Sequence, residues 1–234
     1  MSLDKDIKIP KSIAIILDGN GRYAKKHNMP VTLGHKAGCD NLELILEESA
    51  RLGVKYLYVY AFSTENWKRS EEEKNGLFDL FFVYLNKIKQ KAIDNQISCD
   101  FIGDLSRFSE KIQNSCRELK EITKSFDRLH FIIAFNYGAR DEIVRAVNNI
   151  IKDGVKEVDE NAFSSYLDTK NFVDPDLLIR TSGEMRISNF LLWQIAYSEI
   201  YITDVLWPEF SIEEYHKAII EYNNRERRYG GRTK

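Results

Sequence analysis

Short apolar runs alternate along the chain with longer segments in which apolar residues recur at helical spacing. A short apolar run bounded by polar residues is typical of a strand buried on both faces of a parallel sheet. We predict strands at Ser12–Leu17, Tyr56–Phe62, Ser98–Ile102, Leu129–Phe135, Leu177–Ile179 and Ile200–Ile202. We predict helices at Asn41–Leu52, Leu77–Ile93, Glu110–Lys124, Asp141–Lys152 and Ile212–Arg228. This alternation predicts a single α/β domain over residues 1–234, with a central, largely parallel sheet flanked by helices.

Composition and charge narrow the class of protein. The chain has 234 residues and a formal net charge of −2, so bulk electrostatics does not favour a nucleic-acid partner. The three cysteines, Cys39, Cys99 and Cys116, have no CxxC spacing, which favours a reducing, cytoplasmic location. The first residues are charged and lack an apolar core, so we expect no signal peptide, and we expect no membrane-spanning helix.

The first predicted strand leads into Asp18-Gly-Asn-Gly-Arg22. Glycines allow a tight turn close to a ligand, Arg22 can bind a phosphate through two N–H groups, and Asp18 can bind a divalent cation through oxygen. The segment matches neither GxxxxGK[ST] nor GxGxxG, so both nucleotide-binding motifs are absent here. A simple turn that leads into a helix explains the segment equally well.

Further polar residues lie near the start of the next helix and directly after the second predicted strand. His35, in Gly34-His-Lys-Ala-Gly38, could donate to an anion near a helix N-terminus, although it could equally be an ordinary polar residue there. Ser63-Thr-Glu-Asn-Trp-Lys-Arg69 comes directly after the second strand. Ser70 with Glu73 also fits a helix capping box, and both interpretations can hold together.

Two arginines six residues apart, Arg180 and Arg186, flank a glycine turn after the fifth strand. This arrangement favours the binding of a diphosphate. Glu199 stands in an aromatic, apolar sequence context, where a carboxylate needs a metal or a structural partner. The segment Leu77–Leu85 is apolar around most of its circumference, which indicates either a deeply buried core helix or the wall of an apolar tunnel.

Taken in order, these segments resemble the cis-prenyltransferase family, and in particular its bacterial undecaprenyl diphosphate synthases. The resemblance rests on Asp18-Gly-Asn-Gly-Arg-Tyr-Ala-Lys, Gly34-His-Lys-Ala-Gly, Ala61-Phe-Ser-Thr-Glu-Asn-Trp, Phe135-Asn-Tyr-Gly, Ile179-Arg-Thr-Ser-Gly-Glu-Met-Arg-Ile-Ser-Asn and Ala196-Tyr-Ser-Glu. It implies an Mg²⁺-dependent transferase that condenses isopentenyl diphosphate with an allylic diphosphate, such as farnesyl diphosphate. The implied product is a cis-polyprenyl diphosphate, with undecaprenyl diphosphate for a cell-wall lipid carrier as the main expectation.

The resemblance also implies roles for individual residues. Asp18 and Glu199 would share the Mg²⁺, and Asn66 would assist removal of the proton. Residues around the allylic diphosphate and the reacting carbon would be Gly19, Asn20, Gly21, Arg22, Tyr23, His35, Ser63, Thr64, Glu65, Trp67 and Arg69. Residues around isopentenyl diphosphate would be Arg180, Arg186 and Ser188. The family further implies a homodimer, for which the apolar segment Phe190–Trp207 is a candidate interface, and a loose association with membrane surfaces through the lipid product.

Two positions depart from the family pattern. Tyr23 stands where Trp is usual, and Val31 stands where Arg is usual, so one diphosphate contact is lost or is supplied by Lys25 or Lys26. Product length, preferred primer and the reach of Arg228-Tyr229-Gly230 towards a neighbouring subunit stay open. The alternatives are a short- or medium-chain synthase, a non-catalytic partner subunit, and a phosphate-ester enzyme built on Asp18 and Arg22.

Overall fold

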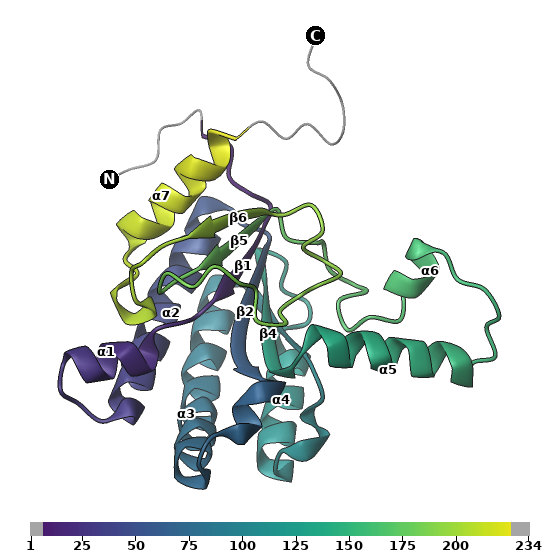
Figure 1. Cartoon of the computed structure of the whole chain (residues 1–234), viewed down its shortest axis with the longest axis horizontal. Helices are drawn as coiled ribbons and strands as arrows, with labels where there is room; N and C mark the ends of the chain where they lie inside the picture. Colours follow the sequence, from purple (N-terminus) through teal and green to yellow (C-terminus); the bar gives the residue numbers. More distant parts are fainter. Residues whose placement is uncertain (1–6, 226–234) are drawn as a thin grey trace.

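Six parallel strands form the centre of the structure, a computed structural model that describes residues 7–225 (Figure 1). The strands are β1 (Ser12–Ile16), β2 (Tyr56–Ser63), β3 (Ile97–Ile102), β4 (Leu129–Tyr137), β5 (Leu177–Arg180) and β6 (Glu199–Ile202). Their order in the sheet is β3-β4-β2-β1-β5-β6, and every neighbouring pair is parallel. All six predicted strands and the predicted fold class are confirmed.

Seven α-helices surround this sheet in the described part of the chain: α1 (Asn20–Lys26), α2 (Val31–Leu52), α3 (Glu71–Asn95), α4 (Glu110–Thr123), α5 (Ala139–Lys152), α6 (Glu160–Ser164) and α7 (Ile212–Asn223). Three short 3₁₀ helices, η1 (Thr64–Lys68), η2 (Leu105–Arg107) and η3 (Trp207–Glu209), follow β2, β3 and β6. No residue range was predicted for α1, although a turn leading into a helix was one interpretation of that segment, and α6 was not predicted. Helix α7 ends at Asn223 rather than at Arg228, and the predicted Arg228-Tyr229-Gly230 contact lies outside the described residues.

The strands alternate their side chains between two apolar clusters. In β1, Ile13 and Ile15 join the cluster beneath α2, α3, α4 and α7, whereas Ala14 and Ile16 join the cluster beneath the start of α5. Both faces of the sheet are therefore covered, as expected for parallel strands. Figure 1 shows α5 and α6 extending away from the sheet as a lateral arm.

Helix α2 begins at Val31, a full ten residues before the predicted Asn41. Gly34 and Gly38 lower helix propensity, which explains the late predicted start. The structure requires both glycines because α1 lies very close. A Cβ atom at Gly34 would lie 2.3 Å from the Asn20 carbonyl oxygen, and one at Gly38 would lie 2.2 Å from Asn20 Oδ1.

Helix α3 is not the deeply buried core helix that its composition favoured. In the segment Leu77–Leu85, only Tyr84 and Leu85 are buried, and Val83 is 51% exposed. Leu77, Leu80 and Phe81 line a pocket, whereas Phe78 packs on Trp67 and Phe108, and Phe82 lies beneath Lys111 of α4. Within residues 7–225, the helices are all too short or too polar to cross a membrane.

Candidate active site

The candidate site lies at the carboxyl edge of the sheet, where β1 and β5 are neighbours. The chain leaves β1 towards β2 on one side and leaves β5 towards β6 on the other, so this is a topological switch point. Ligands of open parallel sheets bind in the crevice at such points. Asp18 follows β1, and Arg180 is the last residue of β5.

Ion pairs connect the charged residues that the sequence had separated. Arg180, only 4% exposed, donates from Nη2 to Asp18 Oδ2 at 2.8 Å and from Nη1 to Ser188 Oγ at 2.7 Å. Arg22 donates to Asp18 Oδ1 at 3.2 Å and also pairs with Glu184. The structure therefore brings the predicted residues Asp18, Arg22, Arg180 and Ser188 together in one anion-binding cluster.

Glu184 belongs to this cluster, although the sequence analysis assigned it no role. One of its oxygens lies 3.2 Å from Arg22 Nη1 and the other 2.5 Å from Arg186 Nη1. Glu184 thus links the arginine of the first loop to an arginine of the second. Its position between Arg180 and Arg186 in the sequence was the signal that could have identified it.

Gly19 allows the first loop to turn beneath Asp18. Its φ of +114° is in the left-handed region, and a Cβ atom there would lie 3.1 Å from Trp207 N. That same Trp207 N–H donates to the Asp18 carbonyl at 3.0 Å, and the Thr181 hydroxyl donates to it at 2.7 Å. The main chain of Asp18 is therefore held by two segments that come from far along the sequence.

The segment Ser63–Arg69 forms η1 at the end of β2 and brings further predicted residues to the same edge. Asn66 and Ser63 form a capping box in which Ser63 N–H donates to Asn66 Oδ1 at 2.9 Å. The Ser70 hydroxyl accepts from Glu73 N–H at 3.2 Å, which confirms the predicted cap of α3. The Glu73 side chain does not complete a second capping box; it pairs with Arg69 at 2.9 Å.

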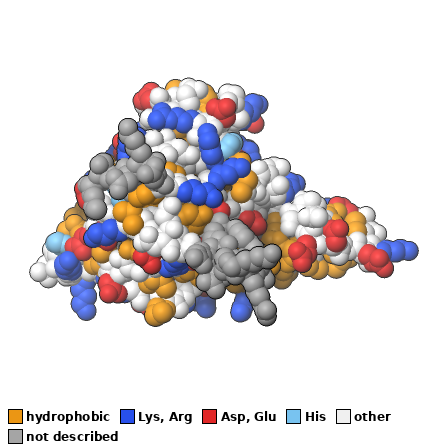
Figure 2. Space-filling model, turned by 90° about the horizontal axis from the view of Figure 1, so that it is seen from above, with side chains coloured by type: hydrophobic (Ala, Val, Ile, Leu, Met, Phe, Trp, Pro, Cys, Tyr) orange, Lys and Arg blue, Asp and Glu red, His pale blue; other side chains and the backbone are white. Residues whose placement is uncertain are grey.

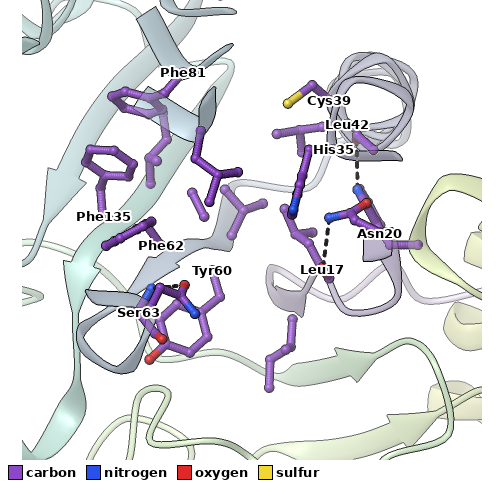
Figure 3. Close-up of a pocket in the computed structure, with 18 of the residues that line it drawn as sticks. Leu17, Asn20, His35, Cys39, Leu42, Tyr60, Phe62, Ser63, Phe81 and Phe135 are labelled. Carbon is purple, nitrogen blue, oxygen red and sulfur yellow. Dashed lines mark hydrogen bonds between the residues drawn. The ribbon is translucent and has the colours of Figure 1, made fainter. Parts of the chain in front are cut away.

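An apolar pocket of about 250 Å³ opens beside the charged cluster. Figure 3 shows His35, Cys39 and Leu42 of α2 on one side of it and Phe62, Phe81 and Phe135 on the other. Its polar end is lined by Asp18, Asn20, Ser63, Asn66, Arg69, Arg180 and Ser188. One cavity thus joins an anion-binding end to an apolar interior.

Trp67 supports the site from behind and does not line the pocket. Its ring packs against Phe62, Phe78 and Phe108, with Arg107 stacked 4.2 Å from the ring centroid. Its Nε1–H donates to Asn136 Oδ1 at 2.7 Å. Trp67 therefore fixes η1 rather than contacting the contents of the pocket.

His35 lines the pocket from the second turn of α2 and not from the start of the helix. Burial, and next the charge of Arg69, lower the pKa of His35 to about 4. Glu73 lies 3.9 Å away, but its charge is compensated by Arg69. His35 is thus a neutral hydrogen-bonding group at neutral pH rather than a cation.

Thr64, Glu65, Gly21 and Tyr23 lie near the site but outside the pocket lining. Burial raises the pKa of Glu65, but hydrogen bonds from its own backbone and from Asn189, Ser63 and Thr64 lower it by more, so the pKa is below the ordinary value. Tyr23 packs on His27 with ring centroids 4.3 Å apart.

Val31 is the first residue of α2 and is 43% exposed. Of the two lysines considered as substitutes for an arginine there, Lys26 is paired with Glu209 at 2.7 Å.

Glu199 is not part of this cluster. It begins β6 and pairs in register with Leu177, which pairs with Ile13 at the amino end of β1. Asp18 lies five residues beyond Ile13, on the order of 16 Å away at the rise of a parallel strand. Glu199 is half-buried and pairs with Arg225 at 3.0 Å, so the two carboxylates of one chain cannot ligate the same ion.

The donor set at Asp18 fits a magnesium ion that arrives with a diphosphate. In residues 7–225 there is no cluster of three or more His, Cys, Asp or Glu side chains suited to a resident metal. Mg²⁺ is commonly held by one or two carboxylates together with substrate phosphates and water. Asp18, whose carboxylate is held by Arg22 and Arg180, could be such a carboxylate, whereas the unpartnered Asn20 Oδ1 is packed against Gly38 of α2.

The fold and site define a parallel α/β protein in which one cavity has charged residues at one end and an apolar interior. Comparison with known proteins agrees with this class. Residues 16–230 match the family model described as putative undecaprenyl diphosphate synthase. An isoprenyl transferase of Fusobacterium nucleatum is 55% identical over 95% of this chain and 96% of its own length. An isoprenyl transferase of Thermotoga maritima is 47% identical over 96% of this chain and 98% of its own.

Two solved structures are similar throughout. Lavandulyl diphosphate synthase from Lavandula x intermedia, in complex with dimethylallyl diphosphate, superposes with a TM-score of 0.91 at 34% identity and covers 95% of this chain and 98% of its own. A probable undecaprenyl diphosphate synthase from Campylobacter jejuni has a TM-score of 0.81 at 34% identity and covers 96% and 100%. The chain belongs to the undecaprenyl diphosphate synthase family of cis-prenyltransferases, as the sequence motifs predicted, and is a prenyltransferase of isoprenoid biosynthesis.

The lowered pKa of His35 gives a testable dependence of stability on pH. An unfolded histidine binds a proton below about pH 6.5, whereas folded His35 does so only below about pH 4. The unfolded state therefore binds more protons between these values, and the free energy of unfolding falls as pH falls from 6.5 to 4. His35→Gln removes this contribution, at most about 3 kcal/mol.

Urea unfolding at several pH values measures the effect. The free energy of unfolding of His35→Gln should decline less steeply than that of the wild type as pH falls from 6.5 to 4. A slope equal to that of the wild type would contradict the assignment.

Proposed function

We propose that the protein condenses isopentenyl diphosphate with an allylic diphosphate to form a cis-polyprenyl diphosphate. The observation that supports this most directly is the single cavity with Asp18, Arg180 and Ser188 at one end and an apolar interior. Such a cavity matches the two chemically different halves of a prenyl diphosphate. Walls from α2, α3 and the sheet surround the tail, and charged residues of the loops meet the head group.

The proposed reaction breaks the bond between the allylic carbon and its diphosphate oxygen, forms a carbon–carbon bond to isopentenyl diphosphate, and releases a proton. Negative charge gathers on the leaving diphosphate, so guanidinium groups fixed beside it lower the barrier. Arg22 and Arg180 can supply these charges once diphosphate oxygens replace the Asp18 carboxylate as their partners. Bound Mg²⁺, held by Asp18, would neutralise part of the same charge. Asn66 lines the pocket from η1, and in this proposal its side chain assists removal of the proton.

Incubation of the protein with labelled isopentenyl diphosphate, farnesyl diphosphate and Mg²⁺ tests this function. Asp18→Asn keeps the shape and an oxygen acceptor but removes the charge, and it should lower kcat by about 10²-fold or more. Asp94→Asn, an exposed residue far from the site, is the matched control and should leave kcat unchanged. Full turnover by folded Asp18→Asn would exclude the proposed role of the carboxylate.

Product length is the finer part of the proposal. We favour a long product, undecaprenyl diphosphate, in which the chain grows along a tunnel beside Leu77, Leu80, Phe81 and Tyr84 of α3. The pocket itself favours a second candidate, a short-chain synthase. Because an apolar cavity of about 150 Å³ holds benzene, one of 250 Å³ accommodates roughly ten carbons, or two isoprene units. Growth beyond that length requires more space than this pocket provides.

Ala61 provides the test of product length. It lines the pocket near the end of β2, where a larger side chain would narrow the path of the growing tail. Ala61→Leu should shorten the products while sparing the first condensation, because space is lost only to the longer tails. Separation of dephosphorylated products by thin-layer chromatography measures this effect.

Ala196→Leu introduces the same change at an exposed site outside the pocket and serves as the control. Long wild-type products that persist in Ala61→Leu would show that Ala61 does not border the tail. Wild-type products of one or two additions would establish the short-chain candidate instead.

We further propose that the protein is a homodimer, but on different residues from those first considered. Phe190, Leu191 and Trp207 of the segment Phe190–Trp207 are fully buried within the chain, so they are not a free interface. Helix α5 instead exposes an apolar stripe of Val144, Val147 and Ile151. Figure 2 shows hydrophobic side chains along the arm that α5 and α6 form. A second copy packed on this stripe would remove it from water.

Light scattering at micromolar concentration should give about twice the chain mass of 27.3 kDa. Ile151→Glu should reduce this mass towards that of one chain, because a carboxylate would be buried without a partner in the interface. Ile122→Glu, on exposed α4 surface, is the matched control and should leave the dimer intact. A wild-type mass near one chain would refute the dimer.

A further inference from the structure

Asn189 lies between the two halves of the candidate site. One half is η1 with the preceding Ser63, which follows β2 and carries Glu65 and Asn66. The other is the clamp loop, residues 181–190, which follows β5 and carries Arg186 and Ser188. The two halves come from strands on opposite sides of β1, so the sheet alone does not fix the distance between their side chains.

The side chain of Asn189 contacts both neighbouring segments. Its Nδ2–H donates to Glu65 Oε1 at 3.1 Å, and its Oδ1 accepts from Arg140 N–H at 2.9 Å. The Asn189 carbonyl also accepts from Ala139 N–H at 2.8 Å. One residue thus joins η1, the clamp loop and the first turn of α5.

The backbone of the clamp loop is shaped for this contact. Ser188 has a φ of +47° and Asn189 a φ of +62°, in the left-handed region. Asparagine adopts this region more readily than most other residues that have a side chain. A compact amide at this position can therefore reach η1 and α5 at once.

Gly138 leaves the space in which the two halves meet. A Cβ atom at this position would lie 2.6 Å from Thr64 Oγ1 and 2.8 Å from Asn189 Nδ2. Its φ of −154° is an extended conformation that any residue adopts, so the close approach of the two side chains is what requires glycine here. A side chain at this position would separate η1 from the clamp loop.

Tyr60 supports the clamp loop on the other side of Asn189. Its hydroxyl lies 3.1 Å from the Tyr137 carbonyl and 3.4 Å from the Ser188 carbonyl, and its ring stacks on Phe190 at 4.4 Å. The loop is thus fixed before and after Asn189. The hydrogen bond from the Asn189 side chain to Glu65 is the side-chain contact that holds η1 against this fixed loop.

We propose that Asn189 is a positioning residue that sets the relative placement of the allylic and isopentenyl subsites, an inference that rests on the proposed function. Each diphosphate has its own charged partners, so each substrate can bind without Asn189. Reaction requires both reacting carbons at near-contact distance, and small misplacements at that distance are costly. Loss of the contact should therefore lower kcat more than it raises either KM.

A double-mutant cycle on Asn189 and Glu65 tests this proposal. Asn189→Asp places a carboxylate opposite Glu65 and replaces the hydrogen bond with repulsion. Glu65→Gln keeps an oxygen acceptor for Asn189. In the combination of both changes, the glutamine N–H can donate to the new carboxylate, so the bond is restored with its polarity reversed. Any contribution of Glu65 itself to substrate binding cancels in the cycle.

We expect Asn189→Asp to lower kcat by about tenfold in the wild-type background. In the Glu65→Gln background, the loss of kcat caused by the same substitution should be smaller by a factor of about five or more. Asn189→Gly keeps the left-handed backbone without the amide and should also lower kcat at nearly unchanged KM values. Arg140→Ala removes an exposed side chain but keeps the backbone N–H, and it is the matched control with wild-type kinetics.

Three results would overturn the inference. One is an active wild type with no coupling between the two positions, which leaves the proposed function intact. Another is a loss of kcat that follows a fall in Tm across the variants, because the role of Asn189 would then be in folding alone. The last is a wild type that does not turn over the two diphosphates, which removes the proposed function and this inference together.

Discussion

Arg180 carries a positive charge at a position that is 4% exposed, and a buried charge is tolerated only with close partners. Its partners are the Asp18 carboxylate, the Ser188 hydroxyl and the carbonyl of Arg186. These groups come from the end of β1 and from the clamp loop, so satisfying one guanidinium fixes two loops against each other. Arg180 Nε is buried and has no hydrogen-bond partner among the described residues.

The same pairing explains how a site can be preorganised before substrate arrives. Asp18 holds Arg22 and Arg180 in the positions where diphosphate oxygens would be needed, at 3.2 and 2.8 Å. Under the proposed function, a diphosphate would exchange one set of oxygen partners for another. Helix α1 packs tightly on α2 at Gly34 and Gly38. This contact holds Arg22, which lies in α1, and the preceding loop with Asp18 in place.

The sequence predicted the strands well because a parallel strand buried on both faces is continuously apolar, as in Ile13–Ile16. It placed Asp18, Arg22 and Arg180 at one edge of the sheet because loops that follow parallel strands meet there. It failed where the answer depended on register or close approach. Glu199 has a suggestive composition around it, but only its register with Leu177 places it at the opposite edge. The start of α2 was missed because its glycines reflect contact with Asn20 rather than a break in the helix.

The partial exposure of α3 has a physical cause that bears on the pocket. A helix apolar on most sides is normally buried on most sides. Here Leu77, Leu80 and Phe81 line a cavity, while the second half of the helix is tied to α2 by Lys91, which pairs with Glu43 and Glu47. Apolar contacts have no fixed geometry, whereas the ion pairs hold the distal half of α3 in register with α2. The apolar wall of the first half is therefore the part of α3 that would have to adjust if the proposed product is longer than two isoprene units, because a pocket of about 250 Å³ does not hold a longer tail.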